Sequence, residues 1–466
     1  MASKKFTTEF KRPLHFMFKN WSIIALLVLS LLIRIYIFQK VRPGFHTDSI
    51  TYLILSDLQT VRTPGYPLLI EAIQFVNDLF SITSNYLGLI VFIQMFLLGM
   101  LNCLLIYKLA KIITENKIFS VAVGLLYNFD YLVIGFEFQI LTETLSISLV
   151  LITILFYMKM FEGKKYAPFA AGLSSAFLLL TRPTFLFLFI ALVFITAITY
   201  FRAIIKKAFF KHYRKTFLIF LLINIFTIGT WSIRNKIKFN YFGFSTLLPY
   251  QLRHYTDRFF HKYKKDDNEL LNRLADIYLE ENRNAHSFYD RLTHEMNLSG
   301  PEVSKLFLKM NLKLIIDNPG DYLKQIPEAI SKYYGVYSFW WTIPQQKKLL
   351  HKKRFIPRIM RFFYNFYHFL FTNLVSQIFI LIVMPVILLI IVRKNKNAFH
   401  LVLICEGIIN YNFLASVLSC NADNLRYRVP VEPLIGLVFF SSLFLLIKVI
   451  INILFPVKSN LNSPPM

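Results

Sequence analysis

The feature that most constrains this chain is a series of apolar runs, most of them about 20 residues long, separated by polar segments. An α-helix needs a run of this length to cross the hydrocarbon core of a bilayer. A spanning backbone must also satisfy its own hydrogen bonds, which favours helices. We therefore predict an all-α polytopic membrane protein with about ten transmembrane helices. The predicted spans are residues 21–38, 86–107, 118–134, 139–160, 167–181, 184–201, 216–233, 370–392, 398–418 and 431–455.

The charge of the chain is strongly positive, with 52 Lys and Arg residues against 26 Asp and Glu. In a soluble protein this excess favours nucleic-acid binding. Here the basic residues cluster between the apolar runs, so retention on the cytoplasmic side and contact with anionic membrane lipids explain them better, and we expect no nucleic-acid partner. Ten spans place both termini on one side, and the basic clusters assign that side to the cytoplasm.

The composition also indicates a compartment. The abundance of Lys, Ile, Phe and Asn favours an AT-rich bacterial genome. We expect an integral, multi-pass protein of the bacterial inner (plasma) membrane, whose active site faces the periplasm or exterior. Its three cysteines form neither a disulfide framework nor a zinc pattern.

The hydropathy pattern divides the chain into five parts. They are a basic cytoplasmic N-terminus (1–20), an N-terminal membrane module (21–233), an outer helical segment (234–369), C-terminal membrane helices (370–455) and a cytoplasmic tail (456–466). The first outer loop, 39–85, contains PGYPLLIEAIQFVNDLF, which predicts an amphipathic helix in the interface.

The outer segment has helical patterns at 268–283 and 301–316. An aromatic run at 333–341 suits the headgroup boundary. The lysine-rich stretch 347–361 predicts an amphipathic helix on anionic lipid, with guidance of an anionic acceptor as an alternative.

Polar residues of unusual kinds gather at the outer ends of the spans. A charged side chain near the membrane interior costs about 2.5–3.5 kcal/mol on insertion scales, so such positions suggest function. Acidic groups with several arginines at one level favour an anionic substrate, because the arginine fork matches phosphate oxygens. The candidates are Asp48, Glu137, Glu143, Arg62, Arg182, Arg234, Arg426 and Arg428.

Asp48 is the candidate base. If Thr47 caps a helix that begins at residue 48, the helix dipole keeps the carboxylate ionised. It can then take the proton of an acceptor hydroxyl while a phosphate held by arginines leaves. Glu137 or Glu143 would bind the acceptor, complete a metal site with Asp48, or orient it.

Five motifs, taken in order, resemble the GT-C membrane glycosyltransferases, and in particular the branch of protein O-mannosyltransferases and lipid A aminoarabinose transferases. They are HTDSITY with RTPGYPLL, ILTETL, LTRPT, WSIRNKIKFNYFG and RYRVPVEPL, between about residues 21 and 440. The resemblance implies the GT-C fold and inverting transfer of a sugar from a polyprenyl-phosphate carrier to a lipid, glycan or protein acceptor at the outer face.

The resemblance also assigns residues. The first-loop aspartate of the family falls on Asp48, and its second acidic position on Glu143 or Glu137. The carrier-phosphate arginines fall among Arg62, Arg182, Arg234, Arg426 and Arg428, and Tyr52, Tyr66 and His46 are expected in the substrate pocket. Many relatives have two adjacent acids in the first loop, whereas Ser49 follows Asp48 here, which weakens the protein-mannosyltransferase substrate. The sequence assigns no specific cofactor, and a divalent metal ion is kept as an alternative.

Simpler interpretations exist for each residue. Asp48 could be a helix-start charge and Glu143 a cap residue, Glu137 a solvated loop residue, and the arginines interface anchors. Two other functions remain as alternatives, a polymerase or ligase of lipid-linked glycans and a transporter or flippase of an anionic lipid. A transporter should place its ionisable residues near mid-membrane, whereas the candidates here gather on one face.

Overall fold

The computed structural model describes residues 2–40, 44, 47–53, 62–199, 208–265, 268–281, 291–292, 294–295, 297–335, 374–422 and 424–455. These residues form helices joined by turns, and their only β-type pairing is an isolated bridge between Gly44 and Gln139. The predicted all-α polytopic class is confirmed.

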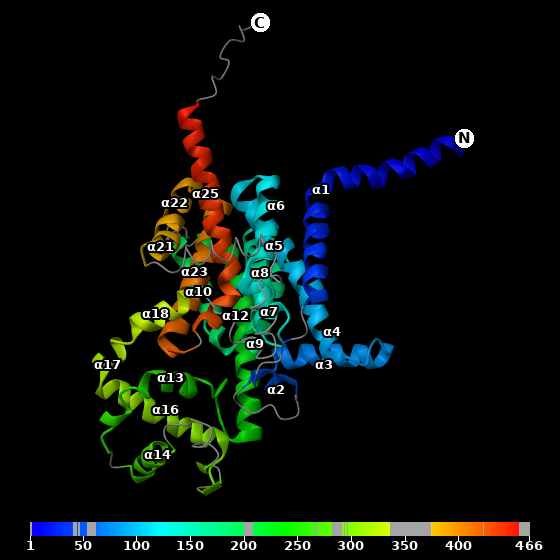
Figure 1. Ribbon diagram of the computed structural model, residues 1–466. Helices are drawn as coiled ribbons and strands as arrows, with labels where there is room; N and C mark the ends of the chain where they lie inside the picture. The colour runs from blue at the N-terminus through cyan, green and yellow to red at the C-terminus, as the bar shows by residue number, and fades with distance from the viewer. Residues whose placement is uncertain are drawn as a thin grey trace.

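The helical bundle contains six helices that are long and apolar enough to cross a membrane. They are α1 (Ala2–Lys40); α4 (Tyr86–Phe92), which continues through the π-helical turn η1 (Ile93–Leu98) into α5 (Gly99–Thr114); α8 (Glu143–Phe161); α12 (Ala208–Phe239); α23 (Lys396–Ser419); and α24 (Asn424–Arg428) with η7 (Val429–Val431) and α25 (Glu432–Leu454). The start of α1 and the end of α25 lie toward the same end of the bundle (Figure 1).

Four shorter apolar helices occupy the remaining predicted spans. They are α6 (Lys117–Leu126) with η2 (Tyr127–Phe129), α9 (Ala167–Thr181), η3 (Pro183–Phe185) with α10 (Leu188–Thr199), and α21 (Leu374–Ile378) with η6 (Phe379–Val383) and α22 (Met384–Val392).

The opposite end of the bundle carries two sets of short helices. The first set is α2 (Thr47–Leu53), α3 (Gly65–Phe80) and α7 (Tyr131–Glu137). The second is α13 (Leu248–Thr256), η4 (Phe260–Lys262), α14 (Glu269–Glu280), α16 (Gly300–Asp317), α17 (Pro319–Leu323) and α18 (Ile326–Tyr334).

Within the second set, α13, η4, α14 and α16 pack around an apolar core that is separate from that of the bundle, and we call these four elements the outer unit. Phe260, Leu271, Tyr278 and Phe307 are among its buried side chains. The buried side chains of α18, such as Tyr333, belong to the core of the bundle. The helices predicted at 268–283 and 301–316 are confirmed as α14 and α16. The predicted stretch 347–361, the tail 456–466 and most of the aromatic run 333–341 lie outside the described residues.

Two predicted spans include non-helical backbone at one end. The prediction of one span over 118–134 is wrong at its end, because the helix stops at Phe129 and Asp130 accepts hydrogen bonds from the backbone N–H groups of Leu132 and Val133. An aspartate that caps a new helix in this way terminates the preceding one. The span predicted from residue 139 begins at Glu143, after an irregular loop.

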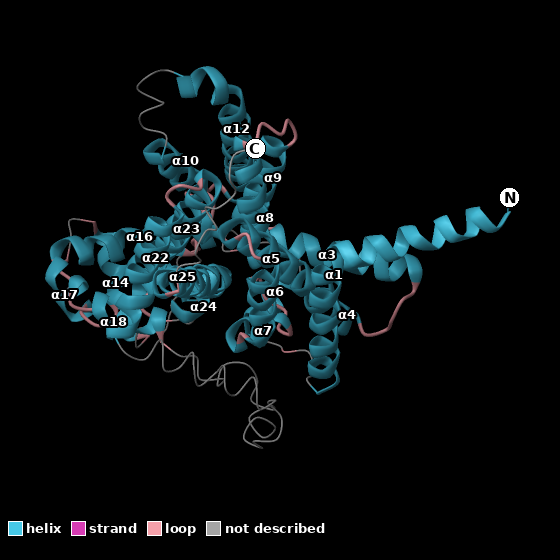
Figure 2. Ribbon diagram, turned by 90° about the horizontal axis from the view of Figure 1, so that it is seen from above, coloured by secondary structure: helices cyan, strands magenta, loops and turns pink. Residues whose placement is uncertain are grey.

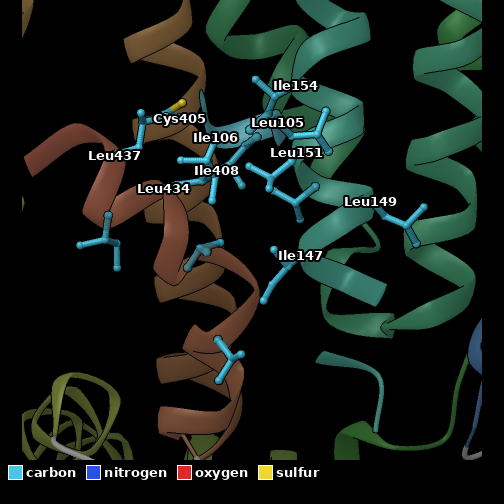
Figure 3. Close-up of a cluster of buried hydrophobic side chains, with 14 of the residues drawn as sticks. Leu105, Ile106, Ile147, Leu149, Leu151, Ile154, Cys405, Ile408, Leu434 and Leu437 are labelled. Carbon is cyan, nitrogen blue, oxygen red and sulfur yellow. The ribbon is translucent and has the colours of Figure 1, made fainter. Parts of the chain in front are cut away.

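The core of the bundle joins α8 to the last helices of the chain. Viewed from above, α5, α8, α23 and α25 are grouped together (Figure 2). Their apolar side chains, such as Ile147 of α8, Ile408 of α23 and Leu434 of α25, are buried in one cluster (Figure 3). This packing brings Glu143 and Arg426 to the same end of the bundle, although 283 residues separate them.

Candidate functional site

Asp48 lies in the first turn of α2, which starts at Thr47. The segment before it is fixed by the isolated bridge, in which the Gly44 N–H donates to the Phe138 carbonyl over 2.7 Å and the Ile140 N–H donates to the Gly44 carbonyl over 3.3 Å. These bonds hold the first outer loop against the loop that leads into α8.

Three arginines and two carboxylates meet at this point, and we call these five residues the carboxylate–arginine cluster. Asp48 Oδ1 is 2.7 Å from Arg62 Nη2, and Asp48 Oδ2 accepts from Arg426 Nη1 over 2.6 Å. Arg426 Nε donates to Glu143 Oε1 over 2.5 Å. Arg182 Nη1 lies 3.3 Å from the same oxygen without hydrogen-bond geometry. Arg426 therefore bridges both carboxylates.

The cluster is graded in exposure. The Glu143 side chain is 0% exposed, that of Arg182 7%, that of Arg426 15% and that of Asp48 28%. Three guanidinium groups against two ionised carboxylates leave one excess positive charge. A partly open, positively charged cluster at the end of membrane helices is suited to a ligand with a negatively charged oxygen group.

The guanidinium of Arg62 is supported by aromatic residues. Arg62 Nη1 donates to the Tyr52 hydroxyl over 3.1 Å, and its guanidinium lies 4.9 Å from the centre of the Tyr52 ring. Burial lowers the pKa of Arg62, but Tyr52 and Asp48 outweigh this effect and raise the pKa above its ordinary value. Arg62 therefore stays charged.

Tyr66 packs edge-to-face on Tyr52, with 5.3 Å between ring centres. It is fully buried, and its hydroxyl donates to the side-chain amide of Gln94. Burial raises its pKa well above the ordinary value, which keeps the hydroxyl protonated as a donor. In this arrangement Tyr66 supports the cluster from behind, while Tyr52 contacts Arg62 directly.

The glycine in RTPGYPLL, Gly65, lies where α3 contacts α9 too closely for a side chain. A Cβ added to Gly65 would lie 2.5 Å from Thr181 Oγ1 and 2.7 Å from the Leu180 carbonyl oxygen. The start of α3 therefore packs directly on the end of α9, which brings Arg62 close to Arg182.

The Gly65→Ala variant is expected to lower the free energy of unfolding by about 1–3 kcal/mol, because backbone atoms on α9 have to move. Thermal unfolding in detergent measures this. Gly229→Ala, inside α12, is the matched control, since its Cβ would meet nothing within 4 Å among the described atoms. Equal unfolding temperatures for the two variants would contradict the close contact.

Arg182 connects the cluster to the outer unit. It follows the last residue of α9, and its guanidinium lies 5.6 Å from the centre of the Tyr427 ring. The Tyr427 hydroxyl accepts from Gln251 Nε2 of α13 over 2.8 Å. The outer unit is thus joined by a hydrogen bond to the edge of the cluster.

Glu137 lies in a separate, buried group. Its side chain is 0% exposed, so the interpretation as a solvated loop residue is wrong. Arg34 Nη2 donates to Glu137 Oε1 over 2.8 Å, and the Tyr127 hydroxyl donates to the same oxygen over 3.0 Å. Of the two glutamates predicted as the second acid, Glu143 is the one that meets Asp48 through Arg426.

Sequence analysis missed Arg34 and Gln94. Arg34 had a readable signal, because it is a charge inside the first apolar run, and such a residue needs a partner. Gly99 makes room for that partner, since a Cβ there would lie 2.5 Å from Glu137 Oε1. Gln94 had no comparable signal.

The remaining predicted residues lie elsewhere or outside the described structure. Arg428 Nε is 2.5 Å from Glu432 Oε2, and its Nη1 donates to the Tyr333 carbonyl over 2.9 Å. Arg234 lies over the ring of Trp231 at 4.5 Å, which is typical of an interface anchor. His46 lies outside the described residues.

The cluster does not fit a divalent metal ion. Both oxygens of Asp48 and one of Glu143 already face guanidinium groups, whose positive charge opposes a second cation at the same place. The described residues contain no group of three or more His, Cys, Asp or Glu side chains that could hold a metal.

The comparison with known proteins finds likenesses among solved structures. No protein-family model and no curated protein matches the sequence. Among solved structures, the chain is similar to the archaeal oligosaccharyltransferase AglB from Archaeoglobus fulgidus, determined in complex with an inhibitory peptide and a dolichol-phosphate. The match has 12% sequence identity and a TM-score of 0.47, and covers 96% of this chain and 53% of that chain. The chain thus spans about half the length of that protein.

Proposed function

We propose that the protein is an inverting GT-C-type glycosyltransferase that moves a sugar from a polyprenyl-phosphate carrier to an acceptor at the outer membrane face. The observation that carries this proposal is the bridging position of Arg426 between Asp48 and Glu143. This position supports the proposal because it brings together, at the end of the membrane helices, a carboxylate that would act as the base and guanidinium groups that would bind the phosphate.

The donor phosphate would bind to the arginines. A sugar linked to a polyprenyl phosphate carries one negative charge, which matches the single excess positive charge of the cluster. Arg426 uses Nε and Nη1 for the two carboxylates, so its Nη2 can donate to a phosphate oxygen, as can Nη1 of Arg182. When the sugar leaves, the phosphate gains a second charge, and nearby guanidinium groups stabilise it.

Asp48 would act as the base. The acceptor hydroxyl oxygen attacks the anomeric carbon, its proton passes to Asp48, and the bond between that carbon and the phosphate oxygen breaks with its electron pair going to the phosphate. Attack from the side opposite the phosphate inverts the configuration. In the structure both oxygens of Asp48 face guanidinium groups. When the phosphate binds and attracts Arg426 or Arg62, one of these oxygens is released and can accept the proton.

The acceptor would be a lipid, a glycan or a protein that reaches the cluster from the outer side, and the outer unit borders this route through Gln251. The proposal includes the bacterial inner membrane as location, with both termini in the cytoplasm. A glycan polymerase and a flippase are less well supported, because the cluster sits at the ends of α8, α9 and α24 and is built around Asp48.

The experiment that tests the proposal uses purified protein in liposomes with a set of radiolabelled polyprenyl-phosphate monosaccharides and envelope extracts as acceptors. Transfer of label from at least one donor, with release of polyprenyl phosphate and inversion at the anomeric carbon, is the expected result. Movement of the intact donor between leaflets without sugar release would instead support a flippase.

Removal of divalent metals is expected to leave the transfer rate unchanged, because the arginines and not a cation neutralise the phosphate charge. The measurement compares initial rates of sugar transfer before and after EDTA treatment, and after addition of Mg²⁺ or Mn²⁺. Loss of transfer with EDTA that either metal restores would contradict this part of the proposal.

A further inference from the structure

Gln94 lies at the crossing of the three chain segments that build the cluster. It belongs to the π-helical turn η1, and its side chain is 0% exposed. Its Nε2 donates to the carbonyls of Glu137 over 3.0 Å and of Gln139 over 2.7 Å, and its Oε1 accepts from the Tyr66 hydroxyl. Both N–H donors of the amide and its oxygen are therefore used.

The two carbonyls lie in the chain that leads into Glu143. This chain is irregular between the end of α7 and the start of α8, so helix hydrogen bonds do not fix it. Gln139 also pairs with Gly44, four residues before Asp48. The same amide thus supports the segments that carry Glu143 and Asp48.

The third bond of Gln94 reaches the segment of Arg62. The Tyr66 hydroxyl donates a hydrogen bond to Gln94, and the ring of Tyr66 packs on the ring of Tyr52. The Tyr52 hydroxyl in turn accepts a hydrogen bond from Arg62. A π-helical turn widens the helix locally and is frequent at functional sites. In this protein the π-helical turn interrupts the span Tyr86–Thr114 at Gln94, whose side-chain amide reaches both α3 and the loop before α8.

We propose that Gln94 is a positioning residue that sets the distance between Asp48, Arg62 and Glu143, and thereby the rate of the transfer step. The inference rests on the proposed function, which it deepens. Loss of the amide would remove the hydrogen bonds of Gln94 to the Glu137 carbonyl and the Tyr66 hydroxyl, and would leave the Gln139 carbonyl with the Leu141 N–H alone. The loop before α8 and the start of α2 would then move relative to Arg62.

The test compares Gln94→Met, which keeps the unbranched shape without the hydrogen bonds, with Tyr66→Phe, which removes only one bond. Asn224→Leu is the matched control, because Asn224 is also a fully buried amide in a membrane helix, bonded to Ser175 and the Phe220 carbonyl. All variants are compared at equal amounts of folded protein.

We expect kcat to fall by about tenfold to a hundredfold in Gln94→Met, because a small misplacement of reacting groups lowers the rate by this order. In Tyr66→Phe the fall in kcat should be smaller. The KM for the donor should stay nearly constant in both variants. Hydrogen exchange of the backbone amides of Gly44 and Ile140 should rise in Gln94→Met and remain unchanged in Asn224→Leu.

Faster exchange with an unchanged kcat would overturn the proposal, because the loop would move without effect on transfer. Slower transfer with unchanged exchange, or an equal loss in Asn224→Leu, would overturn it as well. If the wild type transfers no sugar, the proposed function fails, while the exchange data still decide whether Gln94 holds the loop. If Gln94→Met does not fold, Tyr66→Phe decides the outcome by transfer alone, because it keeps the two bonds of Gln94 to the loop: an unchanged kcat, or an equal loss in Asn224→Leu, would overturn the proposal.

Discussion

The Asp48→Asn variant is expected to lower kcat for sugar transfer by about 10²- to 10⁴-fold, the contribution typical of a positioned base. Asparagine keeps the size of Asp48 but cannot take the proton of the acceptor hydroxyl. Because Asp48 is 28% exposed, we expect the variant to fold and insert normally. The measurement is kcat at saturating donor in liposomes, with protein amount and unfolding temperature determined in parallel.

Asp257→Asn is a suitable control for this prediction. Asp257 lies in the outer unit, where it accepts from the Tyr278 hydroxyl and pairs with Arg253 at 3.8 Å. It is a partly exposed aspartate beside an arginine, as Asp48 is, but outside the cluster. Wild-type transfer by Asp48→Asn would show that another group accepts the proton.

The Arg426→Ala variant is expected to abolish transfer and to destabilise the protein by about 3–5 kcal/mol, the usual result of removing one partner of a buried ion pair. Glu143 is 0% exposed and would keep only Arg182, at 3.3 Å and without hydrogen-bond geometry. Unfolding temperature and transfer rate are both measured.

Two further variants separate the causes. In Arg426→Ala combined with Glu143→Gln, the buried charge is gone, so stability should recover while transfer stays lost. Arg258→Ala removes an arginine whose ion pair with Glu328 is exposed, and should cost less than about 1 kcal/mol and leave transfer intact. Transfer by Arg426→Ala at the wild-type rate would contradict the role of Arg426 in phosphate binding.

The sequence was informative wherever a single run of residues determined the outcome. Apolar runs predicted the helices of the bundle, and the span predicted at 167–181 has the bounds of α9. The ends of helices were less predictable where a polar side chain competes with the helix, as at Asp130. The set of candidate charges at the outer face also followed from the sequence, because charges are rare in such runs.

The pairing of those charges could not be predicted. Whether Glu137 or Glu143 meets Asp48 through Arg426 depends on the packing of α8 against η7, the turn that follows α24, and this packing joins residues 283 positions apart. Arg428 is only two residues from Arg426, yet it pairs with Glu432, because successive positions on a helix point in different directions. The role of Gln94 depends on an irregular loop and a π-helical turn, neither of which has a periodic signature.

The most direct test of the central claim is a structure of the protein in a lipid nanodisc with a polyprenyl phosphate, determined by electron cryomicroscopy. The account predicts phosphate density within hydrogen-bond distance of Arg426 and Arg182 or Arg62, with the polyprenyl chain leading into the membrane and Asp48 beside the phosphate. Density at another set of residues, with Arg426 still bridging Asp48 and Glu143, would contradict it.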